Sequence, residues 1–573
     1  MPIPAAADPG TRAPRRRWLA LALVAASVCA ARDAGAATLV EWGDGSFAID
    51  GAYRFRLAYA SEVPAYATPP QATLPITEGL DAGLTGEHRL RVEPRLELFG
   101  QLSVHAQIDV LDGVLFSDTG DRSFLAYSDQ PPPNELGDSL DSFRVNRAWA
   151  EWRSPAGTLR FGRQPSHWGL GMVANDGDRD DAAFGDSHLG DASDRVLFGT
   201  KPLSVIEALT TGTRPDAASD PLTLGLGYDF GVDRGAVVEP GDDVTQYLAA
   251  LLWDARGSTA FREPVAHRGA GGPRGAASRI GFYAVRREQT HDDRLVSGPA
   301  RPAREILDAW VLDTSGRIVV AADTARGFEL RVEWEAAYVT GKTNFTVSRV
   351  AATPSDPFPV SDAEQWGGIA RLVAESESVA IRLEGGAASG DGNRFDDRVT
   401  DFRFHPDYNV GLILFDELLA TVTAAQAFNV VDQLGEGGPV AFLGANYLAS
   451  DGSVTNALYL NPVVEVDPVP GTSLVAGLVW ARALEPWVDP FNDAFFGGGA
   501  GTLNSFGGDV RSKDLGVEVD VAIHQALPLG LDVVHAEAAL EYGHLFSGAA
   551  FRDGQGADRV DIDEVRLRLD LGW

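Results

Sequence analysis

Cysteine is almost absent from this sequence, with Cys29 as the single example in 573 residues. The chain therefore does not depend on the disulfide framework that stabilises many small secreted proteins. Lysine is scarce as well, with three residues, and 81 acidic residues outweigh 48 basic ones, for a formal net charge of −33. This excess of negative charge argues against nucleic acid as a partner, because binding to phosphates requires clustered basic side chains.

Long apolar runs are missing after the first 36 residues. The run near the start, residues 18–31, has 14 residues and is too short for a helix that spans a bilayer. Three arginines at 15–17 precede this run, and the small residues 34–36 follow it as a cleavage site. The sequence predicts a signal peptide at residues 1–36 and a single exported domain without cysteine at residues 37–573.

Sequence signatures of catalytic sites are lacking too. No serine stands in a G-x-S-x-G context, and no H-E-x-x-H motif occurs. The tripeptide Gly341-Lys342-Thr343 is similar to the end of a P-loop, but Ala336 replaces its first glycine. Residues 175–181 cluster carboxylates that could hold Ca²⁺, but they lack the glycine of an EF-hand loop, so we interpret them as a solvated acidic outer loop. We predict no enzymatic activity, no cofactor and no bound metal.

Short segments in which polar and apolar residues alternate fill most of the chain. In one of them, Tyr53 and Phe55 share one face of an extended chain, while Arg54 and Arg56 share the other. Glycine and proline separate such segments throughout, as expected of strands joined by turns. The pattern predicts about 18 strands, at residues 46–58, 85–99, 101–112, 143–153, 158–164, 194–202, 221–230, 243–254, 278–288, 305–313, 327–341, 365–374, 379–390, 455–466, 472–483, 513–523, 532–546 and 560–573.

Three features favour a membrane barrel over a soluble β-sandwich, which also alternates. The polar faces carry charges of both signs, aromatic residues gather near strand ends, and short connections alternate with long ones. Tight turns near Gly100 and at 154–157, 375–378 and 467–471 all fall on one side of the barrel if the strand count is even. Strands cross lipid only in a closed barrel, because every backbone polar group needs a partner there. The predicted fold is all-β, a transmembrane antiparallel β-barrel with long outer loops and both termini in the periplasm.

Four connections leave the details open. Those at 203–220, 255–277 and 314–326 are long for periplasmic turns, so a strand pair could be miscounted there and 16 strands is the alternative. Residues 391–454 form the longest interruption, as a long outer loop or a plug. Their apolar part, 410–428, could form a short helix inside the barrel or over its mouth, but we favour an outer loop that packs on itself.

The end of the chain resembles the C-terminal assembly signal of bacterial outer-membrane proteins. Trp573 is the terminal aromatic residue, and apolar residues occupy every second position before it, namely Val565, Leu567, Leu569 and Leu571. Residues 148–164 are similar to a hairpin of porin-like and alginate-export-type barrels, and 402–417 resemble a loop of uncharacterised relatives of that group. The resemblance implies a porin-like barrel in the bacterial outer membrane, surrounded by lipid. Alginate-export pores are strongly basic, whereas this chain is acidic, which argues against alginate as the solute.

Barrel closure predicts a basic wall on one side of the lumen. Pairing of the last strand with the first, which also neighbours the second, brings together seven arginines against four acidic residues. The strand at 327–341, roughly across the barrel, carries glutamates instead. One hypothesis is that the two walls create a transverse field that orients polar solutes; the interpretation we favour is that these charges hydrate the wall and pair with one another. The pore-lining candidates are Arg54, Arg56, Arg89, Arg91, Arg95, Glu329, Glu333, Glu335, Arg566 and Arg568.

The function that this pattern favours is a porin-like channel for the passive passage of ions or small polar solutes. A barrel of about 18 strands is wide enough for a water-filled lumen. Two other classes stay open: an outer-membrane enzyme with an active site on the rim, and a plugged structural or adhesive barrel. The sequence leaves the oligomeric state open.

Overall fold

The computed structural model describes residues 38–66, 79–119, 143–178, 182–187, 190–212, 220–234, 242–255, 278–291, 305–323, 327–343, 360–392, 396–426, 449–489, 492–493, 496–497, 500–530 and 534–573. The signal peptide expected at residues 1–36 lies outside this part of the chain and remains a prediction.

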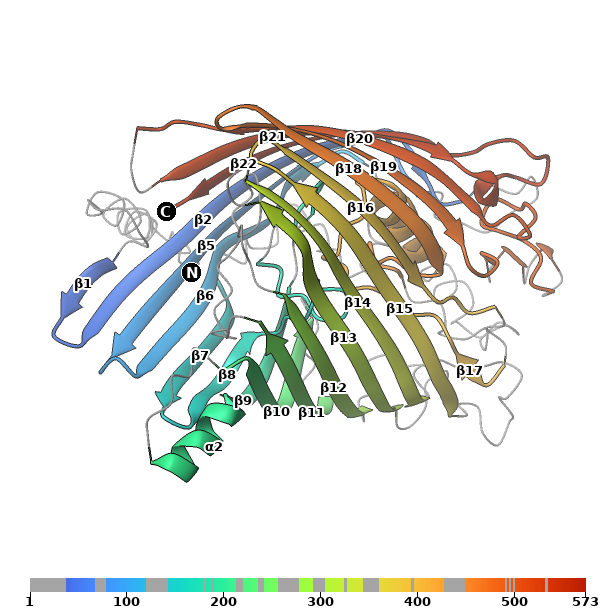
Figure 1. The fold of residues 1–573 in the computed structure, drawn as a ribbon. Helices are drawn as coiled ribbons and strands as arrows, with labels where there is room; N and C mark the ends of the chain where they lie inside the picture. Colours follow the sequence, from blue (N-terminus) through green and yellow to red (C-terminus); the bar gives the residue numbers. More distant parts are fainter. Residues whose placement is uncertain are drawn as a thin grey trace, which may run out of the picture.

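Eighteen antiparallel strands form a closed barrel within the described residues (Figure 1). Neighbouring strands follow one another along the chain, and the last strand pairs with the first, from Ala52 opposite Gly572 to Ala60 opposite Glu564. The strands are β2 (Gly45–Ala60), β5 (Gly83–Leu98), β6 (Leu102–Ser117), β7 (Arg144–Ser154), β8 (Gly157–Pro165), β9 (Asp191–Thr200), β10 (Leu222–Arg234), β11 (Asp242–Asp254), β12 (Arg279–His291), β13 (Glu305–Asp323), β14 (Phe328–Thr343), β15 (Ser361–Glu375), β16 (Val379–Ala388), β18 (Ala457–Val469), β19 (Thr472–Ala483), β20 (Asp514–Ala526), β21 (His535–Ser547) and β22 (Asp561–Gly572).

The predicted fold class and strand count are therefore confirmed. The predicted strands each correspond to one observed strand, and their ends differ by a few residues in most cases. The largest difference is at β13, which continues to Asp323 instead of ending at residue 313, because Gly316 pairs with Trp334 and the indole ring covers the glycine. The long connection predicted at 314–326 is thus mostly strand, whereas 256–277 lies outside the described residues.

The two faces of the barrel wall differ as the alternation predicts. Exposed apolar and aromatic side chains cover the outer face on every part of the wall, among them Trp152, Phe282, Trp366, Leu383 and Leu569. Inward positions on the same strands carry mostly charged or small residues. An apolar exterior around a closed barrel is the arrangement that lipid requires, and the protein is an outer-membrane barrel.

The two ends of the barrel are unlike each other. Tight turns at 99–101, 155–156, 376–378 and 470–471 lie at the end where the chain enters β2 and leaves β22, here called the turn end. Long connections lie at the opposite end, here called the loop end. This places the predicted tight turns and both barrel termini on one side.

Smaller elements surround the barrel. β1 (Thr38–Trp42) pairs with β2, β17 (Arg398–Val399) pairs in parallel with β15, and β3 (Val63–Pro64) pairs with β4 (Gly79–Leu80). Helix α2 (Pro202–Thr211) occupies the connection between β9 and β10 at the turn end, beside the barrel in Figure 1. Two further helical segments are η3 (Leu414–Leu419) and η4 (Ala549–Phe551). Within the described residues, no helix is long and apolar enough to cross a membrane.

Candidate functional site

The connection between β8 and β9 crosses the inside of the barrel. Its described residues, 166–178, 182–187 and 190, are here called the first inward segment. At one end, the Trp168 indole Nε1 donates to Asp313 on β13 at 2.7 Å. At the other end, Asp186 forms an ion pair of 2.6 Å with Arg54 on β2. β13 and β2 are well separated around the barrel, so the first inward segment spans much of the lumen.

The connection between β16 and β18 also packs inside. Its residues 396–426, here called the second inward segment, contain η3 and continue as a helix to residue 426. Buried apolar side chains of this segment pack on inward residues of β18 to β22; Phe404 and Phe415, for example, contact the ring of Tyr459. The barrel therefore has an apolar core inside its lumen against one part of the wall.

The two inward segments bind each other. The His405 backbone N–H donates to the Met172 carbonyl at 2.7 Å, and the Asn175 side-chain amide donates to the Asp407 carbonyl at 3.3 Å. The His405 Nε2 atom also lies 3.2 Å from Asp191 Oδ1 at the start of β9. Together the segments form one body that narrows the lumen.

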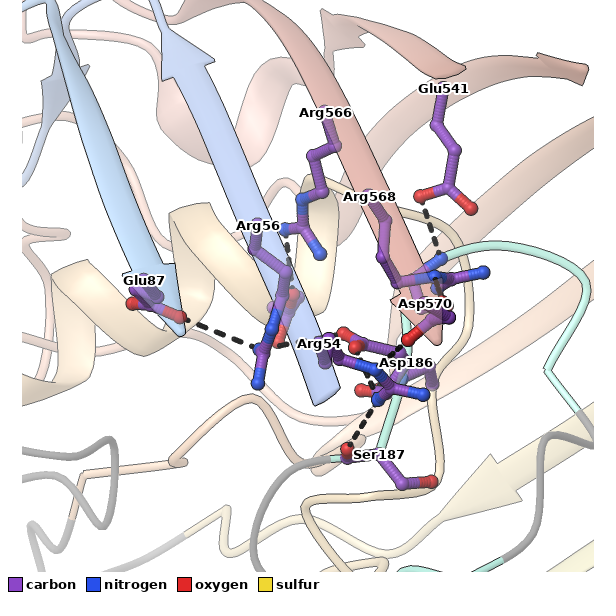
Figure 2. A network of polar contacts seen from close by, with 12 residues as sticks. Arg54, Arg56, Glu87, Asp186, Ser187, Glu541, Arg566, Arg568 and Asp570 are labelled. Atoms are coloured by element: carbon purple, nitrogen blue, oxygen red, sulfur yellow. Dashed lines mark hydrogen bonds and ion pairs between the residues drawn. The ribbon is translucent and has the colours of Figure 1, made fainter. Parts of the chain in front are cut away.

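Four arginines at the closing seam are held by acidic groups (Figure 2). Arg54 lies between Asp570 on β22 and Asp186 of the first inward segment, at 2.6 Å from each. Arg56 lies 3.5 Å from both Asp186 and Glu87. The other two arginines bind both strand and segment groups: Arg566 pairs with Asp416, Glu417 and Glu564, and Arg568 pairs with Asp570 and donates to the Gly185 carbonyl.

The arginines of β5 lie beside those of the seam. Arg54, Arg56, Arg566 and Arg568 of the seam and Arg89, Arg91 and Arg95 of β5 are here called the arginine row. Arg91 pairs with Asp109 on β6 at 2.8 Å and lies 3.5 Å from Asp178 of the first inward segment. Arg89 is buried, with Arg54 as its register partner on β2 and Asp112 as its partner on β6. Arg95 lies nearer the turn end, opposite Ala48.

The three glutamates predicted on the opposite wall divide into two groups. Glu329 and Glu333 pair with Arg317 and Arg331, with shortest distances of 2.8 and 3.0 Å. Glu335 is fully buried and instead binds backbone N–H groups of the first inward segment. The predicted residues thus form two lumen-facing groups, and most of them have charged partners.

The acidic stretch at 175–181 is part of the first inward segment as far as it is described. Asp178 pairs with Arg147 and Arg91, so this aspartate balances wall arginines rather than lying in an exposed loop. Among the described residues, the side chains that converge closely enough for a metal ion are His544, Asp561 and Asp563, on the strand pair β21–β22 near the loop end. The prediction of no bound metal stays a prediction.

The sequence analysis missed several carboxylates that connect the inward segments to the wall, above all Glu518, Asp186, Asp416 and Glu417. Glu518 was recognisable as an inward residue of its strand, but its partners lie about one hundred positions earlier. The acidic residues of the inward segments carry no local signal that distinguishes them from solvated loop residues.

No protein-family model and no curated protein matches the sequence. Solved structures similar to this chain include the outer membrane protein OpdK of Pseudomonas aeruginosa (10% identity, TM-score 0.45), OccK9 of the same organism (11%, 0.44) and OccAB4 of Acinetobacter baumannii (9%, 0.44). Each match covers 92% of this chain and 98% of the other. The strand order and closure described above, rather than these matches, establish a porin-like barrel. The finer resemblance to alginate-export barrels finds no support in them.

Proposed function

We propose that the chain is a porin-like channel for the passive passage of ions or small polar solutes across the outer membrane. The observation that carries the proposal is the partial exposure of charged side chains inside the barrel. Arg56 and Glu87 both point into the lumen, and their side chains keep 20% and 23% of their exposure at a separation of 3.5 Å. A lumen that hydrates an ion pair also hydrates a passing ion, while the apolar outer face holds the barrel in lipid.

We assign the solute path to the part of the lumen beside the contacts of the first inward segment with β2 and β5, where Arg56 and Glu87 keep part of their exposure. The second inward segment fills the region against β18 to β22 with apolar side chains. The arginine row faces the first inward segment from β2 and β5, so an ion on this path passes close to both. Charges near a narrow passage determine which ions enter it.

The transverse field expected from the strands is reduced by the inward segments. Asp178, Asp186, Asp416 and Glu417 bring negative charge to the arginines. Arg89 is the member of the row that best tests the field, because its register partner on β2 is Arg54, which is also positively charged. We propose that the remaining field favours anions near Arg89.

Single-channel recording in planar bilayers tests both statements. The wild-type protein is expected to give stepwise conductance, and Arg89→Gln is expected to shift its selectivity toward cations. Arg286→Gln is the matched control, because Arg286 pairs with Glu288 and has exposed Tyr247 and Trp310 of the outer face as register partners. Absence of conductance would refute the channel. If the protein conducts but Arg89→Gln leaves its ion selectivity unchanged, the proposed field is refuted and the channel is not.

A plugged barrel is the second candidate, because one observation favours it. The second inward segment places fully buried side chains such as Leu412, Leu418 and Leu419 inside the lumen. A silent wild-type protein that is correctly folded in the same bilayers would support this candidate.

A further inference from the structure

A buried glutamate on β14 holds the first inward segment by its backbone. Glu335 Oε2 accepts the backbone N–H groups of Leu170 and Met172, and Glu335 Oε1 accepts that of Val173 at 3.2 Å. The glutamate is fully buried. One side chain therefore fixes a whole turn of the segment against the wall.

A second buried glutamate, on β20, holds the second inward segment in the same way. Glu518 Oε1 accepts the N–H groups of Leu412 and Ile413 at 2.5 and 2.8 Å, and Oε2 accepts that of Leu414 at 2.7 Å. In both sites, one oxygen takes two N–H groups and the other oxygen takes one. Leu414 is also the first residue of η3, so this contact fixes where the helical part begins.

A glycine precedes the bound N–H groups in each segment. Gly169 and Gly411 have φ values of +60° and +77°, a region that favours glycine. A Cβ atom at Gly169 would collide with a carboxylate oxygen of Glu335, and one at Gly411 would collide with Glu518. Both sites thus require the same close approach of backbone to carboxylate, which makes a chance contact a poor explanation.

The two glutamates together fix the position of both segments. The segments bind each other through His405 and Asp407, so they form one connected body. That body reaches the arginine row through Asp186 and Arg54. The room that remains for a solute beside this contact therefore depends on where Glu335 and Glu518 hold the body.

We propose that Glu335 and Glu518 are positioning residues of the channel, which set the width of the solute path by binding backbone N–H groups of the inward segments. The proposal rests on the proposed channel function. A glutamine at either position replaces one accepting oxygen with an NH₂ group that cannot accept, so at least one buried N–H loses its partner.

Thiol labelling tests the positioning directly. In a Cys29→Ser background, Leu412→Cys places a thiol at a buried site next to Glu518, and Met172→Cys does the same beside Glu335. Glu518→Gln is expected to raise the labelling rate of the first reporter about tenfold, because an unpaired buried donor favours opening. Glu335→Gln is expected to act likewise on the second.

Glu375→Gln is the matched control for both reporters. Glu375 is buried and points inward from β15, but its carboxylate pairs with Arg331 at 2.7 Å. The substitution removes the same charge from the wall and is expected to leave both labelling rates unchanged. If Glu518→Gln does not fold, Gly411→Ala disturbs the same contact from the segment side and is expected to raise the same rate.

Bilayer recordings then test whether the position of the inward segments affects the width of the solute path. Glu335→Gln and Glu518→Gln are expected to raise unit conductance, whereas Glu375→Gln is not. Unchanged labelling in both glutamine variants would overturn the positioning role, whether or not the protein conducts. If labelling increases but the wild-type protein shows no conductance, the channel function is refuted. The two glutamates then hold a plug in place. Increased labelling with unchanged conductance would overturn their control of the path.

Discussion

Burial is expected to determine how much an ion pair contributes to the stability of this barrel. Arg195 on β9 and Asp229 on β10 form a two-point pair inside the wall, with distances of 2.6 and 2.8 Å. Their side chains are 7% and 0% exposed. Arg163 and Asp194 form a pair of the same geometry, at 3.0 and 2.8 Å, but with 30% and 28% exposure.

Removal of one partner should have different costs at the two sites. Arg195→Met leaves Asp229 buried without its cation, which costs about 3–5 kcal/mol in the free energy of unfolding. Arg163→Met leaves Asp194 partly exposed near the loop end of β9 and should cost about 0–1 kcal/mol. The double variant Arg195→Met/Asp229→Leu should recover most of the loss, because no buried charge then remains unpaired.

Urea titration of the folded barrel in lipid vesicles, followed by tryptophan fluorescence, gives these free energies. The gel mobility of unheated samples shows that each variant folds before the titration. Equal costs for Arg195→Met and Arg163→Met would refute the reasoning from burial. A double variant as unstable as Arg195→Met would show that packing, and not the unpaired carboxylate, causes the loss.

Three further predictions concern other parts of the protein. Trp573 covers Gly51 on the outer face and exchanges two backbone hydrogen bonds of 3.0 Å with it. Gly51→Leu should therefore displace the indole ring and lower the yield of folded barrel on gels. Gly225→Ala should not, because a Cβ atom at Gly225 makes only ordinary contacts. Leu383→Arg should lower the free energy of unfolding in lipid by about 2–4 kcal/mol, because the exposed Leu383 faces the bilayer; no loss would contradict a lipid-facing position. Burial raises the pKa of Asp489 in the connection between β19 and β20. Its stabilising effect is therefore full below about pH 4 and is lost as the pH rises through the folded-state pKa, so amide protection of Phe506 in hydrogen exchange should fall with rising pH in the wild type and stay level in Asp489→Asn.

The strands were predictable because their signal is local. A wall with lipid outside and polar groups inside imposes a period of two on each strand, and the tight turns need glycine or polar residues. The error at β13 shows the limit of this signal. The local pattern predicted that the strand ends before residues 314–316. These residues continue the strand instead, because Trp334 on the next strand covers Gly316.

The inward segments were not predictable from the same signal. Glu335 and Glu518 bind backbone N–H groups, and a backbone group is the same whatever side chain the residue carries. The sequence showed an apolar stretch at 410–428 but not the wall residue that holds it. The preference for an outer loop rested on local pattern alone, whereas the described contacts are with residues far away in the sequence.

The acidic composition acquires a physical role once these contacts are known. The strands alone present seven arginines against four acidic residues at the closing seam, which suggests a strongly basic wall. The inward segments supply four more carboxylates to the same arginines. An arginine that binds a segment carboxylate both attaches that segment and loses most of its field toward a passing ion, because the opposite charge lies within a few ångströms. Under the proposed channel function, we expect the selectivity of the lumen to depend on the small difference between wall and segment charges, and on where Glu335 and Glu518 hold the segments, rather than on the number of arginines on the wall.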